Sequence, residues 1–176
     1  MKRLLLCGAF LAMTAAVAVT AFVPLAGAGG TAEIVGAGAR ATDAYVGINH
    51  FAVDVSQDAN GVSGVFTFHP DGDPSATFRV EVKCDYIAGN VAVIGGVIVD
   101  AADPSFIGHR YAVGFQDNGD PRGGITPDLV TNHDVMVEPG RTPPLTQADC
   151  AAEAASGNLA NWHLMASGNV QITDAA

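Results

Sequence analysis

The stretch from Phe78 to Asp100 constrains the fold most, because it predicts a β-hairpin with a cysteine in its first strand. From Phe78 to Tyr86 apolar and polar residues alternate, which is typical of a strand with one face in a core and the other in water. The alternation places on the same side Phe78, Val80, Val82, Cys84 and Tyr86. A short connection at 88–90 turns the chain back into a second apolar strand. Gly95-Gly96 interrupts that strand and predicts a bend in the sheet.

The rest of the chain predicts more short strands, separated by turns rich in Gly, Pro, Asn and Asp. They are expected at 51–56, 62–68, 106–115, 129–130, 135–137, 162–166 and 170–173. One brief helix is expected from Thr146 to Glu153, ended by Ser156-Gly157. We therefore expect an all-β fold, a single antiparallel β-sandwich or small barrel with at most one short helix.

The N-terminus has the layout of an export signal, with Lys2-Arg3 before an uncharged apolar run. Pro24 and small residues follow that run, and we expect cleavage after Ala28. The alternative is an uncleaved membrane anchor, since the run is close to the roughly 20 residues that span a bilayer. We expect a protein that is secreted or held in the cell envelope, with no membrane span once the signal is removed.

Three segments follow from this division of the chain. Residues 1–28 form the signal peptide, 29–44 a flexible Gly/Ala-rich lead-in, and 45–176 one β-domain. Without Lys2 and Arg3, six basic residues remain against eighteen acidic ones, a net charge of −12. Such a charge excludes nucleic acid as a partner, because phosphate backbones repel it. The sequence identifies no other partner.

Two cysteines remain after cleavage, Cys84 and Cys150, and an even number in an exported chain predicts a disulfide. Two buried free thiols are the alternative. The bridge would tie the C-terminal segment to the predicted central strand and stabilise by about 4 kcal/mol in the chain-entropy model.

An acidic loop between 117 and 128 is the best candidate for a metal site. Hard oxygen ligands are offered by Asp117, Asn118, Asp120 and Asp128. The glycines of the loop would let backbone carbonyls turn inward, as calcium requires, although the spacing is not that of an EF-hand. Asp and Asn also form turns through their own side chains, so a rigid turn is the alternative.

Five histidines are scattered along the chain with no pair at ligand spacing on a strand. They are His50, His69, His109, His133 and His163. His109 and His133 flank the acidic loop and are the pair to examine. No nucleophile elbow, phosphate loop or dinucleotide fingerprint is present, so we expect no catalytic residues.

Several short motifs together resemble a group of small exported bacterial all-β proteins of uncharacterised function. They are the strand ending in Cys84, Gly89-Asn90-Val91-Ala92, Gly95-Gly96, Asp117-Asn118-Gly119 and Pro127-Asp128. The likeness spans 51–172 and implies an all-β fold with a signal peptide. This chain differs in a longer polar loop at 120–124.

Two functional hypotheses follow. The first is a non-enzymatic secreted or envelope-associated β-domain with a binding or structural role and no cofactor. The second is a protein, or a hydrolase, that holds calcium, zinc or a small ligand at the acidic loop.

Overall fold

A computed structural model describes residues 31–41, 47–119, 126–131, 145–156, 159 and 161–174. Nine strands form one antiparallel sheet in the order β8-β7-β6-β5-β4-β3-β2-β1-β9. The strands are β1 (Ala32–Ala41), β2 (Ile48–Asp58), β3 (Gly61–Pro70), β4 (Phe78–Ala88), β5 (Val91–Ala101), β6 (Arg110–Gln116), β7 (Leu129–Thr131), β8 (Trp162–Leu164) and β9 (Ser167–Thr173). Short 3-10 turns η1 (Pro74–Ala76) and η2 (Pro104–Phe106) lie between strands, and α1 (Gln147–Ser156) is a helix. The all-β class with one short helix is confirmed.

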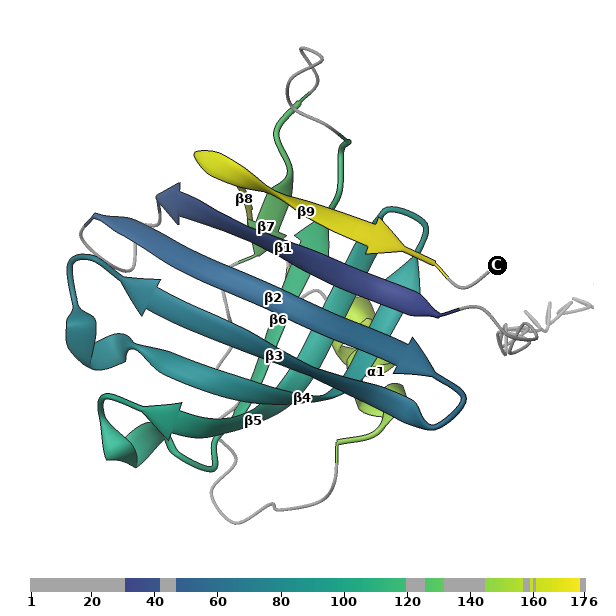
Figure 1. The fold of residues 1–176 in the computed structure, drawn as a ribbon, viewed down its shortest axis with the longest axis horizontal. Coiled ribbons are helices and arrows are strands. Elements are labelled where there is room, and N and C mark those ends of the chain that lie inside the picture. Colours follow the sequence, from purple (N-terminus) through teal and green to yellow (C-terminus); the bar gives the residue numbers. More distant parts are fainter. Residues whose placement is uncertain are drawn as a thin grey trace, which may run out of the picture.

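The sheet curls on itself into a half-barrel instead of splitting into a sandwich. β9, β1, β2 and β3 form one layer, and β5, β6 and β7 cross behind it (Figure 1). Apolar residues on the inner face of every layer fill the space between, among them stacked Phe66 and Tyr111 with ring centroids 5.2 Å apart. The interior is a packed aromatic and aliphatic core.

Residues 32–41 are not part of a flexible lead-in, which was predicted for 29–44, because they form β1. This strand lies between β2 and β9 and pairs with both. Gly36 and Gly38 allow the close approach, since a Cβ at Gly38 would clash with Met165 and with the backbone of β9. The prediction is wrong for residues 32–41.

The predicted hairpin is confirmed as β4 and β5, but the alternation along β4 is broken. A β-bulge between Val82 and Cys84 shifts the register by one residue. Val82 faces the core, whereas Cys84 pairs with Gly95 and faces the outer side of the sheet. The prediction that Cys84 shares a side with Val82 is therefore wrong, because an inserted residue reverses the side of everything beyond it.

Helix α1 packs on this outer side, against β4, β5 and β6. Its disulfide from Cys150 to Cys84 confirms the predicted bridge, with an S–S distance of 2.12 Å. Leu145 and Val97 pack against the two cysteines, so a small second core lies outside the half-barrel. In the parts of the chain described above, no helix has the length and apolarity to cross a membrane.

Candidate functional site

The acidic loop was the main candidate site, and the structure brings three of its four predicted residues together. Asp117 and Asn118 follow β6, and Asp128 precedes β7, which pairs with β6. The Asn118 backbone N–H donates to Asp128 Oδ1 at 2.8 Å, and its Nδ2 donates to the carbonyl of Pro127 at 2.8 Å. Asp120 lies outside the described residues.

The two carboxylates reach across to the last strand of the sheet. Asp128 Oδ2 accepts the Val170 N–H at 2.7 Å, and Asp117 Oδ2 accepts the Ile172 N–H at 3.1 Å. Asp117 Oδ1 accepts the Gly119 N–H at 2.7 Å, so every carboxylate oxygen of the two side chains holds a backbone donor. We call these contacts from Asp117 and Asp128 to β9 the carboxylate seam.

The carboxylate seam closes the half-barrel where strand pairing stops. Residues of β9 alternate between facing β1 and facing away from it, and Val170 and Ile172 present their N–H groups away from β1. Two backbone bonds lie beside the carboxylates, from Met165 N to Asp128 O at 2.9 Å and from Ala166 N to Ala39 O at 2.7 Å. An edge that would otherwise present bare donors is thus covered by side chains.

The hydrogen bonds of the acidic loop do not test the predicted metal site, which stays a prediction. Among the described residues, no three His, Cys, Asp or Glu side chains are grouped as metal ligands. His50 Nε2 lies 3.2 Å from Asp71 Oδ2, and His69 Nδ1 lies 2.8 Å from the hydroxyl of Thr77, both on the surface. His133, one of the pair to examine, lies outside the described residues.

Arg40 is a buried charge that the sequence analysis did not identify. Its side chain extends from β1 into the half-barrel with 2% exposed, and it donates from Nη1 to the carbonyl of Thr131. Burial lowers the pKa of Arg40, while neighbouring Tyr111 acts in the opposite direction. Exposed and inward-facing positions alternate along β1, and this alternation would have identified Arg40 as facing inward. The sequence conceals it, because Gly and Ala occupy many positions on both faces of the strand. The residue joins β1 to β7 and so reinforces the closure made by the carboxylate seam.

A shallow groove of about 450 Å³ lies on the outer face of β3, β4 and β5. Its lining includes Val62, Ser63, Val65, Arg79, Glu81 and Lys83. Lys83 Nζ lies 2.7 Å from Glu81 Oε1, and this hydrogen bond, with the charge of Lys83, lowers the pKa of Glu81. Of the basic residues described, Arg79 and Lys83 are the exposed ones.

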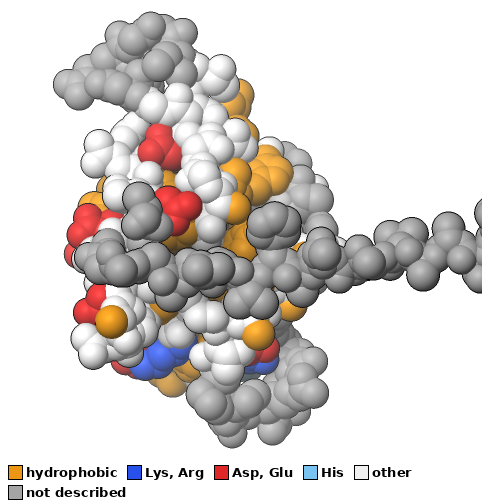
Figure 2. All heavy atoms as spheres, turned by 90° about the vertical axis from the view of Figure 1, so that its right-hand side faces the viewer, with side chains coloured by type: hydrophobic (Ala, Val, Ile, Leu, Met, Phe, Trp, Pro, Cys, Tyr) orange, Lys and Arg blue, Asp and Glu red, His pale blue; other side chains and the backbone are white. Residues whose placement is uncertain are grey.

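The groove matters because basic side chains are rare on this protein, which has eighteen acidic residues against eight basic. Figure 2 shows one face on which red carboxylate side chains recur, while the visible blue ones lie near the lower edge. The groove is therefore where the described surface offers positive charge, alternating with the carboxylate of Glu81 along β4.

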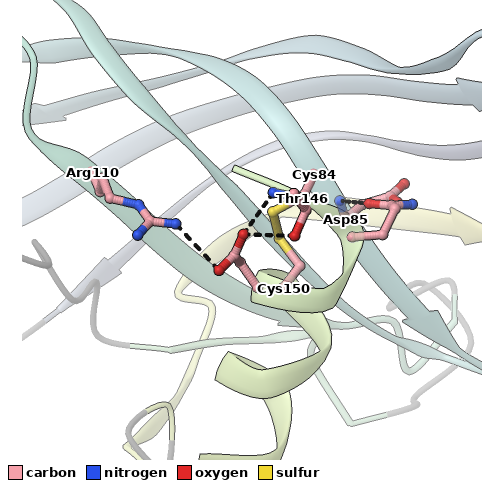
Figure 3. Close-up of a disulfide and its surroundings, with 7 residues drawn as sticks. Cys84, Asp85, Arg110, Thr146 and Cys150 are labelled. Atoms are coloured by element: carbon pink, nitrogen blue, oxygen red, sulfur yellow. Dashed lines mark hydrogen bonds and ion pairs between the residues drawn. A yellow bond between two sulfur atoms is a disulfide. The ribbon is translucent and has the colours of Figure 1, made fainter. Parts of the chain in front are cut away.

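The surroundings of the disulfide form the third polar cluster (Figure 3). Gln147 makes two bonds with Asp85, accepting its backbone N–H and donating to its Oδ1, both at 2.9 Å. Burial raises the pKa of Asp85, and the bond from Gln147 opposes that shift. At the helix start, Asp149 accepts the N–H and the hydroxyl of Thr146, each at 2.7 Å, which lowers the pKa of Asp149.

In comparisons with known proteins, no protein-family model, curated protein or solved structure matches the chain. The resemblance to small exported bacterial proteins stays a prediction.

Proposed function

We propose that the chain is an exported, non-enzymatic β-domain that serves as a binding or structural module in the secreted space or the cell envelope. The observation that carries the proposal is the Cys84–Cys150 disulfide. Such bonds persist in oxidising compartments, and the N-terminus has the layout of an export signal. The carboxylates of the acidic loop bind backbone groups of the fold, so in this proposal they stabilise the domain.

Export and oxidation are tested together on the full chain expressed in a bacterium. We expect the protein outside the cytoplasm, with a mature N-terminus at Gly29 and no thiol that alkylates before reduction. A variant in which Lys2 and Arg3 are replaced by Glu should stay in the cytoplasm with thiols that alkylate. Wild-type protein found in the cytoplasm, or exported with free thiols, contradicts the proposal.

We place the binding face of this module at the groove over β3, β4 and β5. Arg79 and Lys83 give it the exposed positive charge of the described surface. The partner it suits is therefore an envelope component that presents an isolated anionic group, since the net negative charge of the chain repels extended polyanions. Cosedimentation with isolated envelope fragments should fall at least tenfold for Arg79→Glu with Lys83→Glu. Glu33→Gln, a change at an exposed residue of β1, should leave it unchanged. Equal binding by both variants removes the groove from the proposal.

A calcium or zinc site at the acidic loop is the second candidate. The observation in its favour is that Asn118 binds Asp128, and that Asp117 and Asp128 both bind the same strand, β9, at Ile172 and Val170. If a cation binds there, millimolar CaCl2 or ZnCl2 should raise the melting temperature by several degrees and EDTA should reverse the effect. Asp120→Asn should reduce the shift, and a flat titration rejects the site.

A further inference from the structure

Helix α1 has little apolar surface with which to hold itself on the sheet. Its sequence, QADCAAEAAS, offers alanines and one cysteine, and the residues it buries are Cys150 and Glu153. The main core is built from strands and from Met165, and α1 contributes no residue to it. A ten-residue helix is marginal in water on its own, so something other than its own propensity must keep it folded.

The polar contacts of α1 are too weak to do this alone. Arg110 Nη2 lies 3.6 Å from Asp149 Oδ1, and Gln147 makes its two bonds with Asp85. Each contact of these kinds contributes little to docking, because it replaces hydrogen bonds and charge screening that water already supplies. Glu153 acts against docking, because it is buried and its Oε1 has no hydrogen-bond partner among the described residues.

What remains is the covalent tie. Cys84 is fully buried on β4 and Cys150 is 2% exposed on α1, with Leu145 and Val97 packed around them. Gly95 lies beneath both sulfur atoms, where a side chain would leave no room for them. The disulfide thus sets the position of the helix on the outer face of the sheet.

We propose that α1 is a redox-controlled strap: with the disulfide formed it covers the outer face of β4, β5 and β6, and with the disulfide reduced it leaves that face while the half-barrel stays folded. A dithiol reductant supplies two electrons and two protons, the S–S bond breaks to two thiols, and the dithiol becomes a disulfide. Because both cysteines are buried, the reductant acts when the strap opens transiently. The strap does not depend on the binding role proposed above.

Hydrogen exchange read by mass spectrometry tests the strap on the whole protein, with dithiothreitol as the dithiol and the cysteine state verified by mass. Reduction should raise the exchange rate of residues 150–156 at least tenfold and leave β2 and β3 unchanged. Cys84→Ser with Cys150→Ser supplies the reduced state if dithiothreitol does not reach the bond.

Two results would overturn the proposal. One is a helix that stays protected with both cysteines reduced. The other is loss of protection in β2 and β3 together with α1, which would mean that the disulfide holds the whole fold. Oxidised Gln147→Ala is the matched control: it removes the polar tie to Asp85 and keeps the disulfide, so α1 should remain protected. Release of α1 in that variant would mean that Gln147, and not the disulfide, holds the helix on the sheet.

Discussion

Gly95 shows how one missing side chain determines the position of a helix. An added Cβ would lie 2.8 Å from the sulfur of Cys84 and 2.8 Å from that of Cys150, closer than real contacts allow. Gly95→Ala should therefore lower the free energy of unfolding by about 1–3 kcal/mol, the usual cost of overpacking. Urea denaturation of the oxidised protein measures it.

The cause of that loss is separable from a general effect on β5. In a background with Cys84→Ala and Cys150→Ala, the two sulfurs are gone and Gly95→Ala should cost less than half as much. An equal cost in both backgrounds would mean that the strand, and not the disulfide, needs the glycine.

Asp85 is a single residue whose titration should make the stability of the fold depend on pH. Burial raises its folded pKa above the unfolded value of about 3.9, so the folded state holds the proton to higher pH. The contribution of Asp85 to stability is therefore fully present below that unfolded value and falls as pH rises through the folded pKa. Relative to Asp85→Asn, the wild type should lose stability over that window, as urea midpoints at a series of pH values would show. A difference that does not change with pH would contradict the assignment.

Among the elements, β4, β5 and α1 were predictable from sequence and β1 was not. The alternation in Phe78–Val82 and the cap at Thr146 are local patterns, and local patterns survive in the structure. The bulge before Cys84 and the pairing of β1 depend on partners far along the chain. Gly36 and Gly38 look like a linker in sequence, although their lack of side chains is what lets β9 approach.

The acidic loop gives the same lesson for the candidate site. The sequence identified Asp117 and Asp128 as candidate oxygen ligands for a metal ion. In the structure their carboxylates accept hydrogen bonds from backbone N–H groups of β9. Val170 lies 42 residues beyond Asp128 in sequence, so no spacing rule could have paired them. Arg40 escaped for a related reason, because its acceptor on Thr131 is 91 residues away.

At the scale of strands, the carboxylate seam should carry a measurable part of the stability. Asp128→Ala leaves the buried N–H group of Val170 and the part-buried N–H group of Asn118 without their acceptors. We expect it to lower the free energy of unfolding by about 3 kcal/mol, as for two hydrogen bonds to a charged group. Asp54→Ala, at an exposed position on β2, should change it by less than about 0.5 kcal/mol. Equal effects of the two substitutions, measured by urea denaturation, would show that the carboxylate seam is not a stabilising contact.

For the whole molecule, the excess of carboxylates sets the response to salt. A formal net charge of −10 repels itself in the compact state, and raising ionic strength from about 0.01 M to about 0.15 M shortens the screening length from about 30 Å to about 8 Å. The melting temperature measured by calorimetry should therefore rise with NaCl over this range.

A matched variant checks that self-repulsion is the cause. Glu33→Gln with Asp54→Asn removes two exposed negative charges from neighbouring strands, and it should reduce the dependence on salt. A melting temperature that falls with NaCl would show that favourable ion pairs outweigh the repulsion.

The pairing of β1 with β9 has a consequence for how the chain is made. Glu33 lies opposite Thr173, so β1 is synthesised some 140 residues before its partner β9. Until then one side of β1 is exposed, and pairing across such a separation is slow. A binder that keeps the nascent chain extended would be needed for as long as synthesis takes, and premature release should favour misassembly through β1.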